Sequence, residues 1–117
     1  MGRWSFFTIT GKNNLKTTIV TCYCPCKGTS TGSVYSQQLL YMAEKKSAYP
    51  DHIICPRQLF GYDLRRLLES LTANGHQLIV CEDFNSEYSE LSDWMLDLAL
   101  TDMIADRHGP GPKTYNR

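Results

Sequence analysis

The sequence lacks a net charge, a long apolar run and an even set of cysteines. Its 117 residues include twelve basic and twelve acidic side chains, so any binding to nucleic acid must rest on a local patch. No apolar run approaches the roughly 20 residues needed to cross a bilayer, and the first seven residues resemble no signal peptide. These absences, with an ordinary globular composition, predict one intracellular domain at most, with no membrane association.

The cysteines match neither a disulfide framework nor a usual zinc site. An odd count without a secretion signal argues against disulfides, and zinc ligands normally leave two to four residues between cysteines. Reduced thiols packed as small hydrophobic side chains are the favoured interpretation, and their role stays open. The five cysteines are Cys22, Cys24, Cys26, Cys55 and Cys81.

Three runs of the sequence predict β-strands. Residues 3–10 alternate in part, a Gly/Asn cluster follows over 11–14, and residues 15–24 are rich in β-branched side chains, which together predict a hairpin. Residues 77–82 contain a short apolar run bounded by polar residues, which predicts a buried central strand. Asp83 then lies at the C-terminal end of that strand.

Helices are predicted between and after these strands. Residues 34–46 are rich in helix-forming types, and residues 57–73 give the clearest helical pattern. A third helix is expected from about Ser89, and residues 114–117 predict the start of a further strand. The order β-β-α-α-β-α-β predicts a mixed α/β or α+β layered domain. The apolar stripe of the second helix is formed by Phe60, Leu64, Leu67, Leu68 and Leu71.

The segment Glu82-Asp83-Phe84-Asn85 is the strongest candidate for chemistry. An acid at the C-terminal end of a strand projects into the crevice where α/β sheets usually hold ligands. Asp83 and Asn85, two apart in extended chain, point to the same side. They can supply a carboxylate for a hard cation or a water, and an amide for a phosphate oxygen. An Asp/Asn turn after a strand explains the same residues, because such turns are common.

The motif and its surroundings resemble a known superfamily. Asp83-Phe84-Asn85 is similar to the Gly-Asp-Phe-Asn signature of the endonuclease/exonuclease/phosphatase superfamily. Residues 19–25 resemble that family's strand ending in Tyr-x-Pro, and residues 99–103 with 108–117 resemble its leucine-Asp segment and Thr-Tyr strand. The whole layout is similar to the endonuclease domains found beside reverse transcriptases in retrotransposons.

The resemblance implies a fold and an activity. Residues 1–117 would be the central part of a four-layered α/β/β/α sandwich, one sheet with flanking helices, lacking N-terminal and C-terminal strands. The implied activity is phosphodiester hydrolysis, with DNA as the expected substrate and Mg²⁺ or Mn²⁺ as the expected cofactor. Asp83 would align or deprotonate the attacking water or bind the metal, and Asn85 and the Tyr23 hydroxyl would hold the phosphate.

The sequence departs from the family pattern in three places. The family's metal-binding Glu lies upstream of the hairpin, and its closing Asp-His pair lies beyond position 117, so impaired activity is expected. Asp51-His52 precedes the Asp83 strand and is interpreted as a solvated loop. Glu82 stands where the signature has Gly, as either a surrogate metal ligand or a change tolerated in a decaying element.

The residues leave three functions open. The first is an endonuclease-type domain of a mobile element. The second is a non-catalytic remnant that at most binds nucleic acid through Arg57, Arg65 and Arg66, which a solvated helix face explains equally well. The third is a phosphatase of the same superfamily that acts on a small phosphoester. The sequence does not indicate an oligomeric state.

Overall fold

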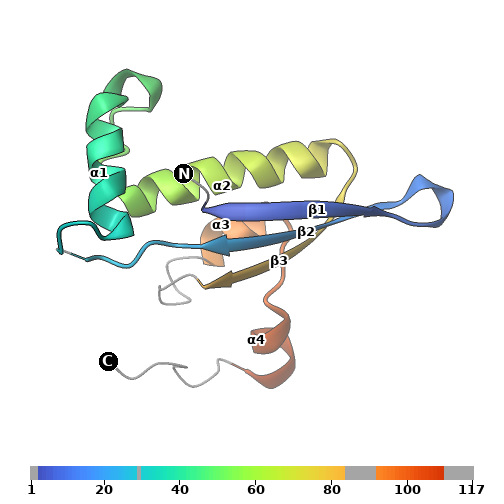
Figure 1. Cartoon of the computed structure of the whole chain (residues 1–117). Coiled ribbons are helices and arrows are strands. Elements are labelled where there is room, and N and C mark those ends of the chain that lie inside the picture. The colour runs from blue at the N-terminus through green and yellow to red at the C-terminus, as the bar shows by residue number, and fades with distance from the viewer. Residues whose placement is uncertain (1–2, 29, 84–91, 110–117) are drawn as a thin grey trace. The chain divides into compact units, whose positions relative to one another are not determined.

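The computed structural model describes residues 3–28, 30–83 and 92–109 of the chain (Figure 1). The chain divides into two compact units, 1–85 and 86–117. The first unit contains a three-stranded mixed sheet and two longer helices, and the second contains two short helices. The fold class is therefore mixed α+β, as the sequence predicts, while the four-layered sandwich stays a prediction.

The N-terminal hairpin is confirmed. Strand β1 (Trp4–Thr10) pairs antiparallel with β2 (Lys16–Tyr23) in an unbroken register from Trp4 opposite Cys22 to Thr10 opposite Lys16. A short 3₁₀ turn, Lys12–Asn14, joins them. Asn13 and Asn14 both have a φ of 58°, a left-handed conformation that Asn tolerates better than most residues.

Strand β3 (Gln77–Asp83) runs parallel to β2 and completes the order β1-β2-β3. The prediction of a buried central strand is wrong for the described residues, because β3 lies at the edge of this sheet. Its side chains alternate between half-buried and exposed, and Ile79 is 50% exposed. The apolar run is split by the strand's period of two, so that Ile79 and Cys81 face away from the helical side.

Helices α1 (Val34–Glu44) and α2 (Pro56–Ala73) connect the two parallel strands. Ser33 is the N-cap of α1, and its hydroxyl accepts a hydrogen bond from the Ser36 N–H, 3.1 Å away. The α2 helix begins with Pro56, which has no N–H to leave unpaired. It ends before Gly75, whose φ of 78° is the left-handed conformation expected at a helix C-terminus.

The core of the first unit lies between α2 and one face of the sheet. Phe60, Leu64 and Leu68 of the predicted stripe are buried, while Leu67 and Leu71 are half-buried. Sequence reasoning missed Leu59, which is 1% exposed and one position before the stripe. On the sheet, Val20 and Thr18 are fully buried. Thr18 shares a hydrogen-bonded chain with Thr8 and His76. The opposite sheet face is covered by none of the described elements of this unit.

The second unit contains α3 (Ser92–Asp97) and α4 (Met103–His108). A helix was expected from about Ser89, and α3 begins at Ser92. The sequence pattern did not predict α4, which begins at Met103, the last residue of the expected leucine-Asp segment. The predicted strand at 114–117 lies outside the described residues.

Candidate active site

The carboxyl ends of β2 and β3 bring two of the predicted site residues together. Tyr23 and Asp83 are register partners on these neighbouring parallel strands, and partners in a parallel pair point to the same face of a sheet. That face is the one opposite α2. The Tyr23 side chain is 42% exposed and Asp83 is also exposed, so both groups can meet a ligand from solvent. Asn85, the third predicted site residue, lies outside the described residues.

Backbone bonds fix the loop that follows Tyr23. The Cys24 N–H donates to the Asp83 carbonyl at 3.0 Å, which extends the β2–β3 pairing by one step. The next two residues, Cys24 and Pro25, are buried. The Arg57 guanidinium of α2 donates to the Pro25 carbonyl at 3.4 Å. The strand end is therefore held both by its neighbour strand and by the first turn of α2.

The Tyr23 hydroxyl stays protonated at neutral pH. It lies 3.8 Å from the Cys26 Sγ as a weak hydrogen-bond donor. Hydrogen bonding with Cys26 raises the pKa of Tyr23, and burial and the negative charge of Asp83 add to the increase. A phenol in this state can donate a hydrogen bond to an anionic oxygen. Sequence reasoning missed Cys26, although its position three residues after Tyr23 in the Cys-x-Cys-x-Cys run was a signal.

Glu82 lies on the opposite face from Asp83, because successive strand residues point to opposite sides. Its register partner is Cys22, and neither carboxyl oxygen has a hydrogen-bond partner among N–H and O–H donors of the described residues. The pKa of Glu82 is raised to about 8, mainly by burial. The weak hydrogen bond from the Cys22 thiol lowers this pKa, and the negative charge of Asp83 raises it. The strand thus does not bring Glu82 and Asp83 together as a pair of metal ligands.

The two thiols nearest Glu82 have raised pKa values. Burial and the neighbouring Glu82 raise the pKa of Cys22 far above its ordinary value. Burial raises the pKa of Cys24 to about 11, although the Arg57 charge lowers it. Metal binding and nucleophilic attack both need the thiolate. Both thiols are therefore protonated at neutral pH when no metal is bound.

The other polar residues singled out by the sequence serve structural roles or lie apart. Arg65 pairs with Glu69 at 2.8 Å on the exposed side of α2, and the Arg66 guanidinium lies 5.5 Å from the Tyr62 ring centre. His52 is exposed in a turn, and His76 is hydrogen-bonded to Thr18 at 2.7 Å. The described residues contain no group of three or more His, Cys, Asp or Glu side chains placed to bind a metal.

Comparisons of the chain with protein-family models, curated proteins and solved structures gave no match. No helix within the described ranges is long and apolar enough to span a bilayer.

Proposed function

We propose that the carboxyl ends of β2 and β3 form part of the phosphate- and metal-binding site of a Mg²⁺-dependent phosphodiesterase of the endonuclease/exonuclease/phosphatase kind, with DNA as its substrate. The observation that carries the proposal is the register pairing of Tyr23 with Asp83. These two residues are 60 positions apart in the sequence, and both belong to one exposed face of the sheet. That shared position supports a common binding site. The ends of parallel strands are where open α/β sheets bind ligands.

The chemistry of this end suits a phosphodiester. The Asp83 carboxylate can accept a hydrogen bond from an attacking water, and the neutral Tyr23 hydroxyl can donate to a phosphate oxygen. Mg²⁺ is commonly held by one or two carboxylates, with water and substrate oxygens completing its shell. Asp83 fits that role, and a bound ion would neutralise charge on the phosphoryl group and leaving oxygen. Because Asp83 is the one carboxylate that the described residues bring to this face of the strand end, we expect weak metal binding.

Paramagnetic Mn²⁺ tests the site directly. We expect Mn²⁺ to broaden the backbone NMR signals of Tyr23, Cys24 and Asp83 in the 117-residue chain, and Asp83→Asn to abolish this local broadening. Asp51→Asn, the same change at an exposed loop carboxylate, should leave it intact. Broadening that survives Asp83→Asn, or that centres on other residues, would refute the proposed metal site.

Activity assays then address the substrate. The recognisable catalytic set in these residues is incomplete and such residues act as a unit, so we expect no plasmid nicking in Mg²⁺ above an Asp83→Ala control. Strong nicking that this substitution abolishes would contradict the expected impairment while supporting the site. In Mg²⁺, a short DNA duplex should shift the Tyr23 signals more than inositol phosphate does. The reverse order would favour the small-phosphoester phosphatase instead.

A further inference from the structure

The outer edge of β1 is a free strand edge as far as the described residues go. The strand order is β1-β2-β3, so one side of β1 pairs with β2 and the other side meets no described strand (Figure 1). Three large apolar side chains of this strand are half exposed: Phe6 at 50%, Phe7 at 57% and Ile9 at 52%. Such an edge can accept a further strand, because its outward N–H and C=O groups have no ladder partner.

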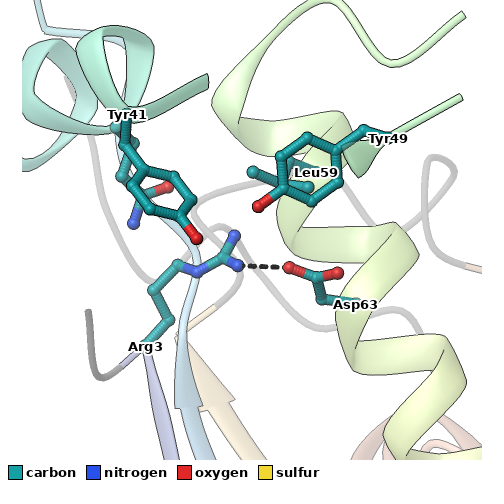
Figure 2. A pocket seen from close by; sticks show the side chains of 6 residues that line it. Arg3, Tyr41, Tyr49, Leu59 and Asp63 are labelled. Atoms are coloured by element: carbon teal, nitrogen blue, oxygen red, sulfur yellow. Dashed lines mark hydrogen bonds and ion pairs between the residues drawn. The ribbon is translucent and has the colours of Figure 1, made fainter. Parts of the chain in front are cut away.

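The strand is held in place from its inner side. All seven of its residues are in unbroken register with β2. Just before the strand, the Arg3 guanidinium donates to the Asp63 carboxylate of α2 at 2.6 Å, an ion pair that Figure 2 shows. The same guanidinium lies 5.0 Å from the Trp4 ring centre. The edge therefore has a fixed extended geometry, and pairing with it requires little further ordering of this chain.

Two hydrogen bonds near the ends of the hairpin show which backbone groups of β1 face outward. The Tyr23 N–H donates to the Arg3 carbonyl at 2.9 Å, and the Gly11 N–H donates to the Leu15 carbonyl at 2.8 Å. Hydrogen-bonded residues alternate along an antiparallel pair, so the odd-numbered residues of β1 turn their backbone groups toward β2. The even-numbered residues turn theirs outward, and they are Trp4, Phe6, Thr8 and Thr10.

β1 has none of the features that usually keep an edge strand from pairing. Its sequence, WSFFTIT, contains no charged residue and no proline, and its register with β2 has no bulge. The other described edge of the sheet differs, because β3 ends with Glu82 and Asp83. On the α2 side, Phe6 shares the face of its buried partner Val20 and is still half exposed. Both faces of the β1 edge are therefore accessible.

We propose that β1 pairs antiparallel with β1 of a second copy of this chain, which joins the two sheets into one. Hydrogen bonds can form only between outward-facing residues, and the two-fold register that then pairs the whole strand is centred on Phe7. Phe7 lies opposite Phe7 of the second copy, and Ser5 lies opposite Ile9. On the other face, Phe6 lies opposite Thr8 and Trp4 lies opposite Thr10.

This self-complementarity favours a second copy over an unrelated strand. Each aromatic residue of the register meets an aromatic or β-branched residue, and such cross-strand pairs stabilise sheets. The strand is uncharged and the formal net charge of the chain is zero, so two copies meet without overall repulsion. Because both copies use the same edge, the assembly closes at a dimer.

The exposed area predicts a reversible dimer. A fully covered aromatic side chain buries about 150–250 Å², so the half-exposed Phe6 and Phe7 each have on the order of 100 Å² left to bury. With Ile9 and the backbone edge added, the interface still falls below the ~1,200 Å² at the lower limit of stable complexes. Association should therefore depend on concentration.

Sedimentation equilibrium of the 117-residue chain tests the association. We expect the average mass to rise with concentration from that of one copy toward that of two and to stop there. A monomer at every concentration up to ~1 mM, a limit that corresponds to very weak binding, would overturn the proposal. Growth beyond two copies would overturn it too, because pairing through β1 alone closes at the dimer.

Two matched substitutions locate the interface. Phe7→Lys places two like charges directly opposite each other at the two-fold axis, so we expect the dimer dissociation constant to rise ~10-fold or more. Ile79→Lys is the control, because Ile79 lies on the same face, is 50% exposed and belongs to β3. It should leave the dissociation constant unchanged. Equal dissociation constants for the two variants would contradict the proposal.

A mixture of Phe7→Lys and Phe7→Glu tests the register. Opposite charges then face each other at the axis, so we expect a mixed dimer that is tighter than the dimer of either variant alone. This gain also shows that both variants are folded. If the mixture associates no more tightly than its components, the Phe7-centred pairing is wrong.

The parent chain gives a test that needs no substitution. In a mixture of isotope-labelled and unlabelled copies, filtered NMR spectra should show contacts between Ser5 of one copy and Ile9 of the other. These residues are roughly 13 Å apart within one strand, so their contact can arise only between copies. A dimer whose intermolecular contacts lie elsewhere would refute pairing through β1.

Discussion

Glu82 is an acidic residue placed where the fold favours its uncharged form. Half-burial against the α2 side of the sheet removes water from the carboxyl, and the Cys22 thiol replaces it only weakly. In the unfolded chain the same group has an ordinary pKa near 4.5, against about 8 in the fold. Between these two values the folded protein binds more protons than the unfolded chain at this position.

This difference predicts a stability that depends on pH through Glu82. The stabilising contribution of the protonated group is complete below about pH 4.5 and is lost as the pH rises to about 8. Glu82→Gln keeps a neutral side chain at every pH and so removes this loss. We therefore expect the urea midpoint of Glu82→Gln to exceed that of the parent chain by more at pH 8 than at pH 5.

Glu44→Gln is the control for this measurement, because Glu44 is exposed at the end of α1. The urea midpoint of Glu44→Gln should differ from that of the parent chain by the same amount at pH 5 and pH 8. A Glu82→Gln variant that also shows no pH-dependent difference would mean that the carboxyl is solvated or charged in the folded protein. It would then be open to reinterpretation as a metal ligand.

At the scale of elements, α2 supplies most of the core. Phe60, Leu64 and Leu68 are each 0–2% exposed, and their spacing follows one face of the helix. The polar side of the helix carries Arg65 and Glu69, whose exposed ion pair contributes little. The stability of the unit therefore depends on the apolar face of one helix.

Leu64→Ala should destabilise the chain by about 2–5 kcal/mol, because it removes buried methyl groups and leaves a cavity. The control is Leu40→Ala in α1, where the side chain is 69% exposed and a change within about 0.5 kcal/mol is expected. Urea unfolding followed by circular dichroism gives both values. Similar losses in the two variants would show that α2 does not pack on the sheet as described.

Local patterns predicted the elements whose partners are close in sequence. The hairpin follows from β-branched runs around a Gly/Asn turn, and α2 follows from its stripe and its Asn74-Gly75 end. The edge position of β3 could not be predicted, since an apolar run reads the same whether one or both faces are covered. The Arg3–Asp63 ion pair could not be predicted either, because the two residues are 60 positions apart.

The same limit applies to the candidate active site. The motif at Asp83 and the strand ending at Tyr23 were visible in the sequence, and the parallel register that pairs them is a product of the fold. Opposite orientations of Glu82 and Asp83 follow from the strand period and could have been deduced once β3 was extended to Asp83. The burial of the Glu82 carboxyl could not have been deduced from the sequence, because it depends on how α2 covers the sheet.

At the scale of the whole molecule, the chain contains two units of unequal content. The sheet, the longer helices and the buried hydrophobic core that the structure describes all belong to residues 1–85. That unit has a helix-covered sheet face and its own hydrogen-bonded ladder, which are the features that a domain needs to fold by itself. The described helices of the second unit, α3 and α4, are six residues each, and helices so short are not stable alone.

We therefore predict that a fragment of residues 1–85 folds without the remainder of the chain. Its methyl NMR signals for Val20, Leu64 and Leu68 should match those of the 117-residue protein, and it should unfold cooperatively in urea. Trp4 is the single tryptophan of the fragment. Its ring centre lies 6.0 Å from the ring centre of Phe60. Its emission should shift to longer wavelength as the fragment unfolds.

A shorter fragment of residues 1–75 provides the matched comparison, because it keeps the hairpin and α2 but removes β3. Without β3 the sheet has two strands, and an isolated pair is at best marginally stable, so we expect this fragment to be largely unfolded. Folding of both fragments would mean that β3 contributes little to the core. Unfolding of both would mean that the first unit requires residues 86–117 to fold.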